Sequence, residues 1–193
     1  MNKTTKAFAL LFTAGLVLAG CGQKQDSTAT TQAKAETTTA APTTATPTTA
    51  TPTTVAQAKT EMPAGAQKTV FEASAKGGTE TMTVYYKDDV LLKQETVEVY
   101  TLSQLEVENA LEKLQNNTAR TKETLKDFIG KGFEYNTEHK GDIFTITYSF
   151  DYTKIDLDKL KEKIPGLDLR DDKTLSYSAY KEGLLKGGYK EKQ

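Results

Sequence analysis

The C-terminal part of this chain is predicted to fold as an α+β domain, and two observations support this. Short stretches of alternating apolar and polar residues form two blocks, separated by one long stretch with helical spacing. Short connections that carry Gly or Asp join the strand-like stretches, which favours hairpins over crossovers. We therefore expect an antiparallel sheet of about five strands, in the order β-β-β-α-β-β-α-α, with the helices packed on one face.

The first block predicts three strands, over residues 69–75, 81–87 and 90–100. Gly77-Gly78 and Asp88-Asp89 supply the two turns, because glycine and aspartate tolerate the positive φ that tight hairpins need. In the second strand, Tyr85 shares one face with two threonines, while the other face is more apolar. Three consecutive strands with short loops predict a meander.

A long helix is predicted next. Ser103 as N-cap and Glu106 three positions later form a capping box, which places the start of the helix at this point. Apolar residues then recur at spacings of three and four until Gly130, which ends the helix. Asn116-Asn117 weaken the middle of the pattern, so two shorter helices remain an alternative.

The second block predicts a hairpin over residues 133–140 and 142–152, around Lys140-Gly141. Its second strand alternates aromatic and aliphatic residues with small polar ones, so one face must cover an apolar layer. Asp156 is predicted to cap a short helix that runs through Ile164, and a last helix is predicted over residues 175–186.

The N-terminus predicts export and lipid attachment. Residues 1–6 are basic, residues 7–18 are apolar but too few to span a bilayer, and the run Leu18-Ala19-Gly20-Cys21 follows. This run is similar to a bacterial lipobox, which implies a signal peptide over residues 1–20, with Leu18, Ala19 and Gly20 recognised by the signal peptidase. The resemblance also implies acyl chains, such as palmitate, on Cys21, the only cysteine of the chain. We therefore expect an extracytoplasmic protein anchored to the cell membrane through Cys21.

Three questions about this segment stay open. An ordinary secreted protein is the alternative to a lipoprotein. The residues after Cys21 fit both the outer leaflet of a single-membrane cell and an outer membrane. Residues 13–20 are also similar to peptide pheromones that some bacteria cut from lipoprotein signal peptides. A pheromone role for the released peptide is therefore a further alternative.

A spacer is predicted over residues 21–66. Residues 24–66 contain no aromatic residue, and prolines recur at five-residue intervals among threonines and alanines. Such a segment has too little apolar surface to offset the entropy of ordering, so we expect a disordered linker. Its Thr-Pro composition also fits a glycosylated stalk. Residues 67–193 then form one folded domain.

The chain resembles the YehR-like bacterial lipoproteins, a family of unknown function. The lipobox and the residues at 85–94, 148–160 and 180–192 carry the resemblance, which covers the folded domain. It implies a compact sheet-and-helix domain in the cell envelope. The spacer is longer than the family pattern implies, and the family lends no catalytic residues.

Few residues of the domain point to chemistry. His139, the only histidine, falls in a predicted turn, where an exposed surface residue is expected. The aspartates at 156, 158, 168, 171 and 172 lack the spacing of a calcium loop, and helix capping explains them. No nucleophile elbow, phosphate-binding loop or paired-thiol motif is present. We therefore expect no enzyme activity, no cofactor and no metal.

The nine tyrosines are the remaining hint. Tyrosine combines apolar area with a hydroxyl, which suits both partner surfaces and sheet packing. Tyr85 is the residue that we expect to be exposed, as a candidate interaction surface.

Charge narrows the class of partner. Residues 61–193 hold 20 Lys and Arg against 24 Asp and Glu, a net charge of −4, without a basic stripe, which argues against nucleic acid. The expected function is non-enzymatic binding of an envelope or extracellular partner. A structural role in the envelope without a discrete ligand is the alternative, and an enzyme comes last.

Overall fold

The computed structural model describes residues 62–192. The lipobox residues Leu18, Ala19, Gly20 and Cys21 and the predicted spacer up to residue 61 lie outside the described residues. Within the described part, none of the helices has the length and hydropathy that a membrane span needs.

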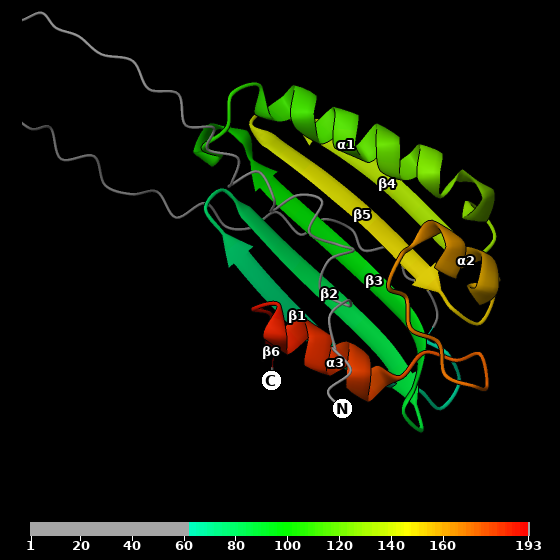
Figure 1. The fold of residues 1–193 in the computed structure, drawn as a ribbon. Coiled ribbons are helices and arrows are strands. Elements are labelled where there is room, and N and C mark those ends of the chain that lie inside the picture. The colour runs from blue at the N-terminus through cyan, green and yellow to red at the C-terminus, as the bar shows by residue number, and fades with distance from the viewer. Residues whose placement is uncertain (1–61, 193) are drawn as a thin grey trace, which may run out of the picture. The chain divides into compact units, whose positions relative to one another are not determined.

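One antiparallel sheet forms the centre of the domain (Figure 1). Its strands are β1 (Gln67–Ala75), β2 (Gly78–Lys87), β3 (Val90–Thr101), β4 (Phe133–Lys140), β5 (Ile143–Asp151) and β6 (Lys190–Lys192). Their spatial order is β4-β5-β3-β2-β1-β6. Five strands were expected, and β6 is the additional one. It pairs with β1, so the last strand lies beside the first.

Within residues 62–192, three α-helices cover one face of this sheet. They are α1 (Ala110–Thr124), α2 (Leu157–Lys163) and α3 (Tyr177–Lys186). Figure 1 shows α1 along β4 and β5, near one edge of the sheet, and α3 beside β1 and β2, near the other edge. The predicted α+β class, the hairpin connections and the placement of helices on one face are confirmed.

The core lies between the sheet and the helices. Phe144, Ile146, Tyr148 and Phe150 alternate along β5 toward the helices, and all are at most 7 % exposed. Their partners across the strand pair on β3 are Tyr100, Glu98, Thr96 and Gln94. The central strand β3 therefore presents a mostly polar side to the core, although Val97 and Val99 occupy its other side.

The turns of the first meander are as expected. Asp88 and Asp89 have φ values of 49° and 64°, the backbone of a two-residue hairpin turn between β2 and β3. Gly77, with φ of 75°, joins β1 to β2 beside the backbone of Gln104. A Cβ at Gly77 would lie 2.8 Å from the carbonyl carbon of Gln104, so this turn requires glycine.

The predicted start of the long helix is wrong. Residues 102–104 form a 3₁₀ turn, and α1 begins only at Ala110, after Asn109 in the left-handed region. The backbone N–H of Ser103 donates to Asp142 Oδ1 at 2.9 Å instead of starting a helix. The turn between β4 and β5 therefore holds Ser103, and this tertiary contact overrides the local capping signal.

The predicted end of the long helix at Gly130 is also wrong, because α1 ends at Thr124 and a separate 3₁₀ turn follows over Lys126–Phe128. The remaining helix signals are closer to the structure. Asn116-Asn117 do not interrupt α1, which is continuous to Thr124. Asp156 caps α2 as expected, because its Oδ1 accepts the Lys159 N–H at 3.2 Å. Ser176 caps α3 in the same way through Ala179, so this helix starts two residues later than predicted.

Candidate functional site

A cavity of about 380 Å³ lies between α1, the start of the loop after α2 and the sheet. Its lining combines apolar side chains with a few polar ones. The lining residues are Glu98, Leu114, Asn117, Thr118, Arg120, Thr121, Thr124, Leu125, Phe133, Tyr135, Ile146, Tyr148, Phe150, Lys163 and Ile164. This volume falls within the roughly 300–1,000 Å³ typical of small-molecule sites.

The apolar stripe of α1 forms the wall opposite the sheet. Leu114 and Thr118 lie one turn apart, and they are 1 % and 6 % exposed. The Thr118 hydroxyl donates to the Gln115 carbonyl at 2.8 Å, and that of Thr121 donates to the Asn117 carbonyl at 3.1 Å. Because the helix backbone accepts both hydroxyl protons, the hydrogen-bonding demand of these threonines is met within α1. The wall is therefore less polar than its composition indicates.

A buried carboxyl forms part of the cavity lining. Glu98 is 6 % exposed, and Tyr100 donates a hydrogen bond to its Oε2 at 2.7 Å. Glu80 lies directly opposite Glu98 across β2 and β3 and is 5 % exposed. Its Oε2 accepts the Tyr189 hydroxyl proton at 2.6 Å, while its Oε1 has no partner among the described residues. Two carboxyls thus share the core side of the sheet, while the buried cation Lys93 pairs with Glu95 at 2.7 Å on the opposite face.

Burial shifts the acidity of both groups. Burial raises the pKa of Glu98 to about 7, against the opposing effect of the Tyr100 and Tyr148 hydroxyls. Burial, together with the charge of Glu98, raises the pKa of Glu80 to about 8, against the hydrogen bond from Tyr189. Both carboxyls are therefore largely protonated at pH 6 and below.

Hydroxyl groups of tyrosines satisfy the polar side of β3. Gln94 is fully buried, and its Oε1 accepts a proton from Tyr152 at 3.0 Å and another from Tyr180. Its Nε2 donates to Thr96 at 3.0 Å. These tyrosines come from the residue after β5 and from α3, so the network joins the helical layer to the centre of the sheet.

Two cations stand at the exposed border of the cavity. Arg120 on α1 and Lys163 on α2 line it, and both side chains are exposed, whereas Glu98 is buried. Lys122 on α1 lies nearby, with its Nζ 5.6 Å from the ring centre of Tyr135, which also lines the cavity. The cavity thus runs from a positively charged mouth to an interior that holds Glu98.

Tyr85 is not the exposed residue that we expected. It lies on the sheet face opposite the helices, as predicted, but only 9 % of it is exposed. Its hydroxyl donates to Glu95 at 3.0 Å, and the Lys93 Nζ lies 5.6 Å from its ring centre. Neighbouring polar side chains therefore occupy the surroundings of Tyr85, and its role as an interaction surface remains untested.

The other tyrosines serve packing rather than a surface patch. Six more are at most 8 % exposed, namely Tyr100, Tyr148, Tyr152, Tyr177, Tyr180 and Tyr189. Tyr86 stacks on Tyr177 with ring centres 3.5 Å apart, and Tyr135 stacks on Tyr148 at 6.0 Å. Between the two uses that the sequence left open, the structure favours the core.

The polar residues considered from the sequence take structural roles. His139 is exposed as predicted, but it lies in β4, opposite Phe144, rather than in the turn; its Nε2 is 2.8 Å from the carbonyl of Gly141, the first turn residue. Asp158 pairs with Lys173 at 2.7 Å, and Asp172 accepts the Thr174 N–H at 3.0 Å. Among the described residues, no three His, Cys, Asp or Glu side chains form a group that could hold a metal.

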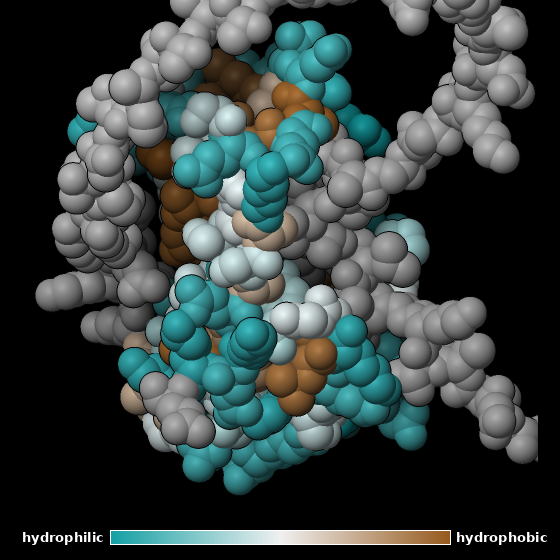
Figure 2. Space-filling model, turned by 90° about the vertical axis from the view of Figure 1, so that its left-hand side faces the viewer, coloured by the Kyte–Doolittle hydropathy of each residue, from teal (hydrophilic) through white to brown (hydrophobic). Residues whose placement is uncertain are grey.

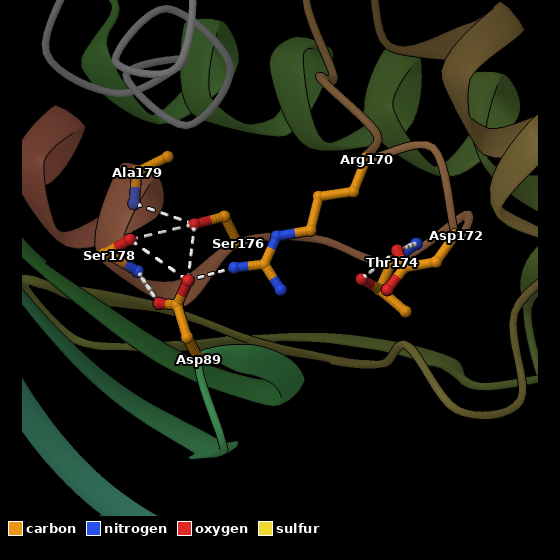
Figure 3. A network of polar contacts seen from close by, with 7 residues as sticks. All are labelled: Asp89, Arg170, Asp172, Thr174, Ser176, Ser178 and Ala179. Carbon is orange, nitrogen blue, oxygen red and sulfur yellow. Dashed lines mark hydrogen bonds and ion pairs between the residues drawn. The ribbon is translucent and has the colours of Figure 1, made fainter.

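A second polar cluster surrounds Asp89 (Figure 3). Its Oδ1 accepts the Ser178 N–H at 2.6 Å, and its Oδ2 accepts bonds from Arg170 and from the Ser176 hydroxyl. Burial acts to raise the pKa of Asp89, but hydrogen bonds from Ser178 and Ser176 and the charge of Arg170 hold it below its usual value. These bonds join the β2–β3 turn to the N-terminus of α3, so the cluster caps a helix.

The surface offers a weaker candidate than the cavity. On the end of the domain drawn in Figure 2, hydrophilic side chains cover much of the visible surface, and hydrophobic ones appear in separate patches. The large apolar residues that are exposed within residues 62–192 are Met62, Ile129, Ile143 and Leu185. They come from separate elements, as is normal for a protein surface.

Sequence reasoning missed Glu80 and Glu98. A weak signal existed, because Glu80 alternates with Met82 and Val84 along a strand whose apolar face must be buried. Glu98 had no such signal, since its neighbours Val97 and Val99 indicate the opposite face for the core. Only the pairing of β3 with β5 reveals that Glu98 lies beneath α1.

Comparisons with known proteins concern the same folded part. A family described as "Protein of unknown function (DUF1307)" matches residues 67–190. An NMR structure of the Escherichia coli YehR protein is 20 % identical, covers 65 % of this chain and 90 % of that chain, and has a TM-score of 0.48. An NMR structure of a Streptococcus pneumoniae TIGR4 protein is also 20 % identical, with coverage of 86 % and 100 % and a TM-score of 0.41. No curated protein matches the chain.

The family match spans the stretch in which the sequence predicted a relationship to a family of unknown function, and this prediction is confirmed. The chain belongs to the DUF1307 family.

Proposed function

We propose that this protein is a lipid-anchored binding protein of the cell envelope, and that its ligand occupies the cavity beneath α1. The lipobox sequence supports the anchor at Cys21, and the cavity supports binding. In this proposal the domain lies outside the membrane and binds a small molecule.

The cavity itself is the observation that carries the proposal. Small-molecule sites are concave, mostly apolar and carry a few polar groups. A recess of about 380 Å³ that opens to solvent at Arg120 and Lys163 and reaches a buried carboxyl supports a ligand site. The lining holds one carboxyl and neither histidine nor cysteine, which favours binding over catalysis.

Replacing Cys21 by Ala tests the anchor. We expect the wild-type protein to incorporate a labelled fatty acid and to fractionate with membranes, because two or more acyl chains give stable attachment. The variant should lose the label entirely and leave the membrane fraction. A Cys21→Ala protein that keeps its label would show that the lipid is attached elsewhere, and a wild type that takes up no label would overturn the anchor.

Filling the cavity tests the site. Thr118→Phe places a ring where the buried threonine of α1 faces the cavity, and Ala119→Phe places the same ring on the exposed side of the next residue. We expect the wild type and Ala119→Phe to bind Nile red, a neutral apolar fluorophore, with equal affinity. Thr118→Phe should weaken binding at least tenfold, because the ring occupies the volume that the dye needs.

A thermal melt of each variant shows whether it is folded, and Thr118→Leu serves if the larger ring prevents folding. Equal dye binding by the variants at 118 and 119 would remove the cavity from consideration. Absence of dye binding by the wild type would favour the alternative of a structural envelope protein without a discrete ligand.

A further inference from the structure

We infer that the ligand of this cavity is an anionic amphiphile, with an alkyl or acyl chain inside the cavity and an acidic group at Arg120 and Lys163. The inference rests on the proposed binding function and adds the chemical class of the ligand. Three features support it: the two cations at the opening of the cavity, the apolar walls, and the carboxyl at the buried end.

Arg120 and Lys163 are the two cations among the residues that line the cavity. Lys126, just after α1, pairs with Glu123 at 2.6 Å, and Lys159 on α2 pairs with Asp156 at 3.1 Å. Within residues 62–192, neither Arg120 nor Lys163 forms an ion pair. Two cations that have no acidic partner in the described part of the chain, and that reach one opening from two different helices, fit an anionic group.

The walls suit a hydrocarbon chain. Leu114, Leu125, Ile146, Ile164, Phe133 and Phe150 are apolar and at most 6 % exposed. The hydroxyls of Thr118 and Thr121 donate to the α1 backbone, so these side chains make no further demand for a polar partner. A chain in this space removes its methylene groups from water, at about 0.8 kcal/mol for each one.

The buried end argues against a cationic ligand. Glu98 would have to be ionised to pair with a cation, but burial raises its pKa to about 7 and thereby favours the neutral form. Tyr100 already donates to Glu98 Oε2 at 2.7 Å. A cation would also have to pass Arg120 and Lys163, and Lys122 adds positive charge beside Tyr135. The neutral carboxyl is compatible with a hydrocarbon chain end.

The acidic group could be the carboxylate of a fatty acid or the phosphate of a lipid, which share the same requirement for Arg120 and Lys163. An acyl chain attached to Cys21 brings no acidic group to the mouth, so the charge argument favours a separate molecule. The experiment therefore uses the full chain with Cys21→Ser, which cannot carry its own lipid.

The test compares probes with one tail and different heads. Decanoate, decyl phosphate, decanol and decylamine displace Nile red from the full-length Cys21→Ser protein at pH 6.5, each below its micelle-forming concentration. We expect decanoate or decyl phosphate to bind about tenfold more tightly than decanol, because two partly screened ion pairs together contribute about that factor. Decylamine should bind more weakly than decanol. Preference between the two anions identifies the kind of acidic group.

The variant Arg120→Gln/Lys163→Gln should bind decanol as the wild type does and lose the preference for anions. Lys113→Gln, an exposed α1 lysine that does not line the cavity, is the matched control and should keep the preference.

The remaining outcomes separate the two proposals. Equal affinity for all four heads, with binding still lost in Thr118→Phe, would overturn the anionic class and leave the cavity as a binding site. Tighter binding of decylamine would overturn it in favour of a cation held by Glu98. Displacement of the dye by none of the probes, with Nile red itself bound, would overturn the amphiphile. Absence of Nile red binding would overturn the proposed function itself.

Discussion

Raising the pH from 5 to 9 is expected to lower the free energy of unfolding by on the order of 5 kcal/mol, because two buried carboxyls must ionise. The folded state raises the pKa of Glu80 from 4.5 to about 8 and that of Glu98 from 4.5 to about 7. Between pH 4.5 and these values the folded chain binds more protons than the unfolded chain, so stability falls as pH rises. The contribution is fully present below pH 4.5 and is lost by pH 9.

Between pH 5 and 9, the expected change in stability comes from Glu80 and Glu98 and not from the aspartates and lysines whose pKa values are also shifted. Asp89, Asp151, Asp156 and Asp172 have pKa values below 3.8, so the stability that they contribute is lost only in acid. The lysines with raised pKa values, such as Lys126 and Lys154, act above pH 10. Neither set changes its charge between pH 5 and 9.

Urea unfolding at a series of pH values measures the effect. Glu80→Gln and Glu98→Gln mimic the protonated carboxyl, so each should flatten part of the slope and raise stability at pH 9. Glu134→Gln, on the exposed side of β4, is the control and should retain the wild-type slope. A wild-type stability that is level from pH 5 to 9 would show that the pair is not buried together.

Replacing Gln94 by Leu is expected to destabilise the domain by about 2–4 kcal/mol, although leucine has a similar size and is apolar. Gln94 accepts the hydroxyl protons of Tyr152 and Tyr180 in the interior, and both lose this acceptor in the variant. A buried group that loses its partner costs more than the hydrogen bond contributed, because it also has no access to water.

A second substitution separates this cause from a packing defect. Gln94→Leu/Tyr152→Phe removes both the donor and the acceptor of the Tyr152–Gln94 hydrogen bond. This double variant should recover part of the stability lost in Gln94→Leu, as measured by urea unfolding at pH 6. Gln104→Leu, at an exposed position, should change stability by no more than about 0.5 kcal/mol. If the double variant is less stable than Gln94→Leu, the cost arises from packing.

The sequence predicted those parts of the fold that local physics determines. Alternation with short turns predicted five strands, and Asp88-Asp89 predicted a hairpin, because aspartate tolerates the positive φ that a two-residue hairpin turn needs and that both residues have. Strand β6 was missed because its three residues, Lys190–Lys192, carry no apolar pattern, and pairing with β1 alone makes it a strand. The helix start predicted at Ser103 was wrong for a related reason, because a residue distant in sequence, Asp142, binds Ser103.

The candidate site could not be predicted, for a reason specific to β3. Apolar Val97 and Val99 lie on the side of this strand away from the helices, and polar Gln94, Thr96 and Glu98 lie under them. Periodicity alone assigns the core to the wrong side of such a strand. The tyrosines supply the hydroxyls that make this polar side compatible with burial, which explains their number better than a binding surface does.

The pairing of β1 with β6 affects the order in which the chain acquires its structure. β1 begins at Gln67 and β6 ends at Lys192, so the outer edge of β1 has no partner until nearly all of the domain has been synthesised. The hairpins of neighbouring strands can form early, because their loops are short. The edge of β1 stays open until α3 and β6 arrive, and during that interval it is available to other strands. Synthesis of the last residues therefore covers the middle of this edge, at Val70, Phe71 and Glu72.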